Sequence, residues 1–483
     1  MFLHTMVLPG QESQRAASVH TARVLLLLAC SGSLDLPGDT APTPVPDTGD
    51  TDTTPPHDSA TTELIDPAPV DTAPDGFAHL PILLVDTEGA ITDTTKVGGR
   101  LQVIEEHDGS FTDVARAPRA YDGRIGIELH GSSSLGYPKL GYKLECRDDT
   151  DVDVDCALAG MPEGSDWVLH APYSDKALIR NALAYSLARD VSGERWEPRS
   201  QLVELVVNGD YVGVYLLVER VSREPDRLDI PPTTDPKDGS VDGGFIVHVD
   251  QHRSAGFDTA RGTPIDWYTP KSTAVTPDEA AYILGWFDGL EAAMAADTFA
   301  DATVGYPAWL DVDAWVDHFL VNELAHNIDA YRLSAYLWTD GPPGAALLRA
   351  GPVWDFDRAW GDCNYCESWM AEGWIYDSLD RCGYAYQFPM WWPRLRQDPA
   401  FEQRLSLRWA ELRAGVLSDA ALMERIADLS QSLDEAQPRD QARWGTIGVH
   451  IEPNYYVGAT YSEEVSWLAQ WTFDRAAWMD GML

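Results

Sequence analysis

The stretch from Gly351 to Gly361 reads Gly-Pro-Val-Trp-Asp-Phe-Asp-Arg-Ala-Trp-Gly. It ends an apolar, strand-like segment at 345–354. On an extended backbone, residues two apart share a face, so Asp355 and Asp357 are expected to point together while Phe356 packs behind them. Two convergent carboxylates suit Mg²⁺, which prefers oxygen ligands. The alternative interpretation is a solvated turn that carries two acidic residues.

A third acidic residue of interest lies upstream, after a predicted helix. Apolar residues over 311–327 fit a helix that buries one face, and Asp329 follows before a strand-like piece at 334–338. The order is helix, loop with an aspartate, strand, turn, strand and paired aspartates. This order resembles protein kinases, in which a catalytic-loop aspartate precedes the metal-binding aspartate. An ordinary loop carboxylate near a helix end is the alternative.

Basic residues are scarce, so their positions are informative. The small-residue turn at 131–134 precedes Lys139 and Lys143, which could cover and neutralise phosphates or lie on an ordinary solvated hairpin. Arg180, on a predicted helix, could reach a phosphate or pair with an acidic neighbour. Glu219 ends a strand-like run, where it could pair with a strand lysine or lie on an edge strand.

The pattern of apolar residues predicts a β-rich first half and a mainly helical second half. A helix is expected from about Asp175, a good N-cap residue, to Val191. Asn208-Gly209 predicts a tight hairpin turn. Further strands are expected at 80–85, 100–106, 124–130, 142–146, 202–207, 212–218 and 244–249, and helices at 278–296, 397–415, 418–435 and 461–480. This order favours an α+β fold over alternating βαβ units.

The charge of the 483-residue chain narrows the classes of ligand. It carries 35 basic and 77 acidic residues, for a net charge of −42. Such a surface repels phosphate backbones, which argues against nucleic-acid binding. A nucleoside triphosphate could enter only with divalent cations and a few well-placed basic residues.

The N-terminal part predicts an exported, lipid-anchored protein. An apolar run at 24–29 follows Arg23 and ends at Cys30, as in a lipoprotein signal, although a chance apolar run is the alternative. We therefore expect a signal segment at 1–30, with lipid on Cys30 holding the protein to a membrane. Residues 31–76 contain nine prolines, ten acidic residues and no lysine or arginine, which predicts a disordered linker. The folded domain is expected at 77–483.

Five cysteines remain after Cys30, and export would permit disulfides. Cys146 and Cys156 flank a short acidic loop and form a plausible pair. Two of Cys363, Cys366 and Cys382 could pair and leave one over. A Cys-x-x-Cys motif can also bind zinc, but a second ligand pair at the usual spacing is missing.

Several motifs together resemble the CotH family, the spore-coat-protein-H-like kinases. They are Asp166-Trp167-Val168-Leu169, the segments 175–181 and 204–219, the turn at 131–134 with Pro138-Lys139, and Trp354-Asp355-Phe356-Asp357 up to Gly361. The resemblance covers roughly 77 to 480. It implies an atypical protein-kinase-like fold that uses ATP and Mg²⁺ or Mn²⁺ to phosphorylate Ser or Thr of an unidentified protein substrate.

The resemblance also implies roles for individual residues. Asp329 matches the catalytic aspartate of the family, and Asp355 with Asp357 matches its metal-binding motif. Lys143 matches the lysine-bearing strand expected near the phosphates of ATP, and Lys139 is the less favoured match. We include Arg180 and Glu219 as further candidates for the nucleotide site.

Two departures from the family pattern leave other functions open. Leu333 and Ser334 stand where many members carry an asparagine, and Asp362 stands where asparagine commonly follows the glycine of the motif. A catalytically weak or inactive surface binding or adhesion protein with the same fold is therefore the first alternative. A secreted glycosidase is the second, but it needs a carboxyl pair at a defined separation, and Asp355 and Asp357 are too close in sequence.

Overall fold

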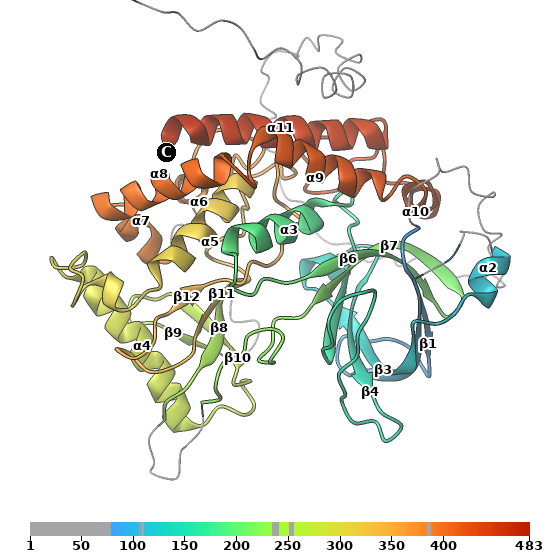
Figure 1. Ribbon diagram of the computed structural model, residues 1–483, viewed down its shortest axis with the longest axis horizontal. Coiled ribbons are helices and arrows are strands. Elements are labelled where there is room, and N and C mark those ends of the chain that lie inside the picture. The colour runs from blue at the N-terminus through green and yellow to red at the C-terminus, as the bar shows by residue number, and fades with distance from the viewer. Residues whose placement is uncertain (1–78, 106, 108–110, 234–240, 251–255, 384–387) are drawn as a thin grey trace, which may run out of the picture. The chain divides into compact units, whose positions relative to one another are not determined.

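The computed structural model describes residues 79–483, apart from 106, 108–110, 234–240, 251–255 and 384–387 (Figure 1). The predicted signal segment at 1–30, including Cys30, and the predicted linker at 31–76 lie outside these residues. Within the described part of the chain, no helix has the length and apolar character needed to cross a bilayer.

The first half of the described chain forms a closed β-barrel in the strand order β1-β2-β3-β4-β5-β7-β6. Parallel pairing of β1 with β6 closes it, with Ile82 opposite Glu204. Alternate residues such as Leu83, Val85, Ile125 and Ile127 fill the interior, as expected for strands with one buried face. The strands are β1 (Ile82–Thr87), β2 (Val97–Ile104), β3 (Tyr121–His130), β4 (Gly141–Arg147), β5 (Asp166–His170), β6 (Ser200–Val207) and β7 (Asp210–Glu219).

The predicted hairpin turn is confirmed between β6 and β7. Asn208 and Gly209 both have positive φ, at 52° and 80°. Two consecutive residues with positive φ match the twist of the flanking strands, and asparagine followed by glycine is the pair that best tolerates this geometry. The turn thus fixes the register of the hairpin that ends at Glu219.

Helix α3 (Arg180–Ser192) begins five residues later than predicted. Leu178 has a φ of +63°, which interrupts a helix from Asp175. The carboxylate of Asp175 nevertheless satisfies the helix start, because it accepts hydrogen bonds from the backbone N–H of Arg180 at 2.8 Å and from its guanidinium at 2.5 Å. The prediction of Asp175 as the N-cap is wrong, because Ile179 holds that position, although the Asp175 carboxylate still accepts from the first helical N–H.

A second sheet has the strand order β12-β11-β8-β10-β9. The predicted strands at 244–249 and 334–338 correspond to β8 and β11, whereas β9 and β10 were not predicted. The strand expected over 345–354 is much shorter, because only Arg349–Ala350 pairs with β11. The bounds are β8 (Phe245–Val249), β9 (Gly256–Asp258), β10 (Pro264–Thr269), β11 (Ala335–Thr339) and β12 (Arg349–Ala350).

Helices dominate the second half, and the predicted α+β class is confirmed (Figure 1). Almost every residue of α5 is buried, and this helix contacts α3, α8 and α11. It therefore lies at the centre of the larger apolar core. The helices are α2 (Phe111–Arg116), α4 (Pro277–Ala295), α5 (Val312–Ala325), α6 (Ile375–Arg381), α7 (Trp391–Leu395), α8 (Pro399–Arg413), α9 (Asp419–Gln431), α10 (Ala436–Trp444) and α11 (Tyr461–Met482), with 3-10 turns η2 (Ser133–Gly136) and η3 (Tyr306–Ala308).

The cysteine predictions are also resolved. Cys146 pairs with Cys156, as expected from their positions on either side of the acidic loop. Cys366 pairs with Cys382, and Cys363 is a buried free thiol. The disulfide that involves Cys366 takes one residue of the Cys-x-x-Cys motif, so the motif does not present two thiolates to zinc here.

Candidate active site

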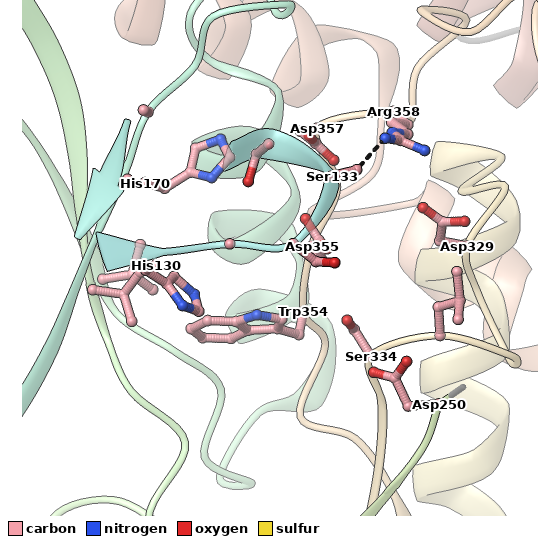
Figure 2. A pocket seen from close by; sticks show the side chains of 18 of the residues that line it. His130, Ser133, His170, Asp250, Asp329, Ser334, Trp354, Asp355, Asp357 and Arg358 are labelled. Carbon is pink, nitrogen blue, oxygen red and sulfur yellow. Dashed lines mark hydrogen bonds between the residues drawn. The ribbon is translucent and has the colours of Figure 1, made fainter. Parts of the chain in front are cut away.

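A cavity of about 620 Å³ brings the barrel, the η2 turn and the segment after α5 together (Figure 2). This volume lies in the range usual for small-molecule sites. The residues predicted from sequence that line it are the turn Gly131–Ser134, Lys143, Asp329, Asp355 and Asp357. Its wall is also formed by His130, Val168, His170, Val218, Asp250, Arg332, Ser334, Trp354, Arg358 and Tyr365.

The two aspartates of the motif converge on the cavity, but the backbone that carries them is not a strand. Asp355 has a φ of +66°, in the left-handed region, so the expected alternation of an extended chain is wrong here. Asp355 and Asp357 nevertheless both line the cavity, and Phe356 between them is fully buried, as expected. A left-handed aspartate held in place at a cavity is the kind of strained backbone that clusters at functional sites.

Hydrogen bonds from α3 and from two loops hold this strained segment. The N–H of Phe356 donates to Oδ1 of Asn181 on α3 at 2.8 Å. The N–H of Val353 donates to the buried carboxylate of Glu197 at 2.8 Å. Asn327, just after α5, donates its side-chain amide to the carbonyl of Asp355 at 3.3 Å. One residue of α3 and two residues of the loops that follow α3 and α5 thus hold the backbone that carries the paired carboxylates.

The carboxylates of Asp355 and Asp357 repel each other in a buried setting. Burial raises the pKa of Asp355 well above its usual range, and the negative charges of Asp357 and Asp329 raise it further. A divalent cation would remove this repulsion, and carboxylate oxygens are the ligands Mg²⁺ prefers. Within the described chain, no group of three or more His, Cys, Asp or Glu side chains is arranged to hold a metal. Two carboxylates still fit Mg²⁺, which usually takes one or two protein carboxylates together with phosphate oxygens and water.

Asp329 lies across the cavity from this pair (Figure 2). Its Oδ1 accepts a hydrogen bond from Nη2 of Arg332 at 2.7 Å. Burial raises the pKa of Asp329, while the charges of Arg332 and Arg358 act against this rise. A buried carboxylate with a raised pKa, oriented by a guanidinium, is equipped to accept a proton from a bound hydroxyl.

The opposite wall supplies small residues and positive charge. Lys143 of β4 lines the cavity with its Nζ 3.8 Å from Oε1 of Glu128. Burial is the main reason that the pKa of Lys143 is lowered. The turn Gly131–Ser134 places hydroxyl and backbone groups at the same cavity, a combination suited to phosphate oxygens.

A family model described as CotH kinase protein matches residues 127–479, which include every one of these predicted side chains. The chain belongs to the CotH kinase family. No curated protein matches it. The family predicted from the motifs is thereby confirmed.

Three of the residues predicted for the nucleotide site of this CotH-family chain lie elsewhere. Lys139 is 1 % exposed, and its Nζ lies 2.5 Å from Oδ1 of Asp440 on α10. Glu219 is fully buried and accepts hydrogen bonds from the backbone and the guanidinium of Arg199 at 2.9 and 2.7 Å. Neither lines the cavity. The lysine partner expected for Glu219 is an arginine instead, and β7 is an interior strand between β5 and β6 rather than an edge.

Arg180 belongs to a buried polar network behind the cavity. Its guanidinium lies 2.5 Å from Asp175 and 3.5 Å from Asp362. Asn454 donates to both carboxylate oxygens of Asp362 at 3.2 and 3.1 Å, and accepts from Lys176 at 2.5 Å. We call Asp175, Lys176, Arg180, Asp362 and Asn454 the Arg180 network. The sequence left open whether Arg180 reaches a phosphate or pairs with an acidic neighbour, and the structure shows the acidic neighbour.

Sequence reasoning missed several cavity residues of this CotH-family member. Arg358 donates to Oγ of Ser133 at 2.9 Å and to the hydroxyl of Tyr365 at 3.2 Å. Its place directly after Asp357, in a chain poor in basic residues, was a usable signal. His130 gave no such signal, and burial lowers its pKa to about 3, so the imidazole is neutral.

Proposed function

We propose that this CotH-family protein transfers the γ-phosphoryl group of ATP to a Ser or Thr hydroxyl of a protein substrate. The observation that carries the proposal is the arrangement of Asp329 opposite Asp355 and Asp357 in one cavity, with Lys143 and the turn Gly131–Ser134 on another wall. Family membership supports the same chemistry. The two-part organisation, β-rich and then helical, is consistent with a kinase-like fold.

In the proposed reaction, the acceptor oxygen forms a bond to the γ-phosphorus of ATP. The bond from that phosphorus to the bridging oxygen breaks, and ADP leaves with the electron pair. Asp329 orients the acceptor hydroxyl and takes its proton, while Arg332 holds the Asp329 carboxylate in place. Catalysis in this class rests on positioning and charge stabilisation.

Asp355 and Asp357 are the residues that would hold Mg²⁺ or Mn²⁺. Such an ion supplies the positive charge that a triphosphate needs in an acidic cavity. Lys143 adds a positive charge at the phosphates. In this proposal, the protein provides two carboxylates for the metal ion and places basic side chains at the cavity, although its overall charge is strongly negative.

We further propose that the protein acts at the cell surface or in the periplasm, held by lipid on Cys30. This rests on the signal-like sequence at 24–30 alone.

The alternative function is a binding or adhesion protein without turnover. One feature of the cavity favours it: Ser334 lines the cavity at a position where many relatives are expected to carry an asparagine.

The experiment is phosphate transfer by the purified full-length chain, with labelled ATP, Mg²⁺ or Mn²⁺, and a Ser-rich protein acceptor. We expect labelling by the wild type and a loss of about 10²- to 10⁴-fold for Asp329→Asn, the usual contribution of a general base. Asp313→Asn, at the exposed start of α5, is the matched control and should label normally. Absence of labelling in the wild type, with metal-dependent ATP binding intact, would favour the binding protein.

A further inference from the structure

Of the residues that the structure describes, three cations line the cavity, and they differ in their partners. Lys143 lies near the carboxylate of Glu128, and Arg332 forms an ion pair with the carboxylate of Asp329. The guanidinium of Arg358 instead donates to two hydroxyl groups. Among the residues that the structure describes, no carboxylate lies within ion-pair distance of it.

The charge of the Arg358 guanidinium is balanced from a distance. The side chain is only partly exposed, and although burial opposes the charged form, the negative charges of Asp357 and Asp329 help to keep the pKa of Arg358 raised. The group stays protonated in proteins, and it has five N–H donors arranged as a planar fork. Ser133 and Tyr365 occupy two directions of that fork, so further donors remain for an anion in the cavity.

The position of Arg358 indicates which anion it meets. In Figure 2 its side chain lies on the same side of the cavity as Asp357 and Asp329, and the negative charges of both act on it. In the proposed reaction, the group being transferred must lie between the metal-binding pair and the catalytic aspartate. Lys143 reaches the cavity from β4 of the barrel, on a different wall.

We propose that Arg358 binds the terminal phosphate of ATP and stabilises the charge that develops on it during transfer. This assignment rests on the proposed function. Planar, bidentate contact with phosphate oxygens is the geometry for which arginine is suited. Ser133, already bonded to Arg358, would close the η2 turn over the same phosphate.

A purely structural role for Arg358 is the rival explanation. The residue could simply tie the η2 turn to Tyr365. The two roles differ in how they affect nucleotides of different length, because a structural tie has no preference for ATP over ADP, whereas a contact with the terminal phosphate concerns ATP alone.

The experiment measures the dissociation constants of ATP and ADP for the full-length chain by calorimetry, with Mn²⁺ present. Arg358→Gln is expected to weaken ATP binding about 10- to 100-fold, the usual value of a hydrogen-bonded charge pair, and to leave ADP binding unchanged. Arg358→Lys should recover only part of the preference, because it keeps the charge and loses the fork. Arg404→Gln, on the exposed surface of α8, is the matched control.

Equal losses for ATP and ADP, or no loss for either, would overturn the assignment of Arg358 and leave the proposed function standing. Wild-type protein that binds neither nucleotide would overturn both. A variant that fails to fold is recognised by its thermal unfolding, and Arg358→Lys then serves as the second probe. A folded R358K protein that keeps the full wild-type preference for ATP over ADP would contradict the assignment.

Discussion

Two groups of buried carboxylates lie a few residues apart in the sequence and have different partners. Asp362 sits in the Arg180 network, where a guanidinium and an asparagine amide contact it. Asp355 sits at the cavity, where the charges that act on it are those of Asp357, Asp329 and, with opposite sign, Arg358. Burial raises the pKa of both, that of Asp362 to about 7 and that of Asp355 well above its usual range.

This difference in partners assigns Asp362 to a structural role and Asp355 to a functional one. Buried charges that find partners within the protein hold helices and loops together. Buried like charges that face a cavity cost free energy, and they persist where a ligand is to supply the missing positive charge. Three substitutions test this comparison.

The largest effect is expected in the Arg180 network. Arg180→Met removes the guanidinium and leaves Asp175 and Asp362 buried beside each other. Breaking a buried ion pair from one side usually costs about 3–5 kcal/mol, and we expect a loss of this size in the free energy of unfolding. Urea denaturation followed by tryptophan fluorescence measures it, with Arg404→Met as the exposed control. A loss below about 1 kcal/mol would show that the network does not support the fold.

The next effect has the opposite sign. Without metal, the pKa of Asp355 is higher in the folded chain than in the unfolded chain. The folded protein therefore keeps a proton that the unfolded chain releases, and stability falls as pH rises above about 4. Asp355→Asn cannot ionise, so we expect it to be more stable than the wild type at pH 8 and equally stable near pH 4.

Thermal unfolding in EDTA between pH 4 and pH 8 measures this difference. Asp362, Glu197 and Glu323 have pKa values raised to about 7 by burial, so both proteins should lose stability up to that pH. The two curves should meet near pH 4 and separate above it. Parallel curves would mean that Asp355 is not held protonated at the cavity.

The smallest effect on stability is expected at Lys143. Its contact with Glu128 is long and partly exposed, and such pairs contribute little. Lys143→Met should change the free energy of unfolding by no more than about 0.5 kcal/mol, while ATP binding weakens about tenfold through loss of a charged contact. Lys271→Met, at an exposed position, is the control. A marked loss of stability with unchanged ATP binding would assign Lys143 to a structural role.

The sequence was sufficient for features that depend on local pattern. The helix predicted at 278–296 is α4, which begins at the capping box of Thr276 and Glu279. The turn at Asn208-Gly209 fixes its hairpin. Closure of the barrel was not predicted, because it depends on parallel pairing of β1 with β6, more than a hundred residues apart.

Site residues were predicted correctly where a sequence motif specifies them. The prediction failed where contacts between distant parts of the chain decide whether a side chain reaches the cavity. Asp329, Asp355 and Asp357 share the cavity as expected, although the left-handed backbone at Asp355 replaces the expected strand. Lys139 and Lys143 were both candidates from sequence, with Lys143 preferred. Their separation is decided by Asp440, 301 positions from Lys139, which no local pattern reveals.

The contact between Lys139 and Asp440 also imposes an order on the making of the molecule. A ribosome releases the barrel strands long before the residues of α10, so during synthesis the ammonium of Lys139 has no carboxylate to meet. Its burial becomes favourable only when nearly the whole polypeptide has emerged. A chain that stopped short of α10 would therefore carry its defect at Lys139, just before strand β4 of the barrel that was made first.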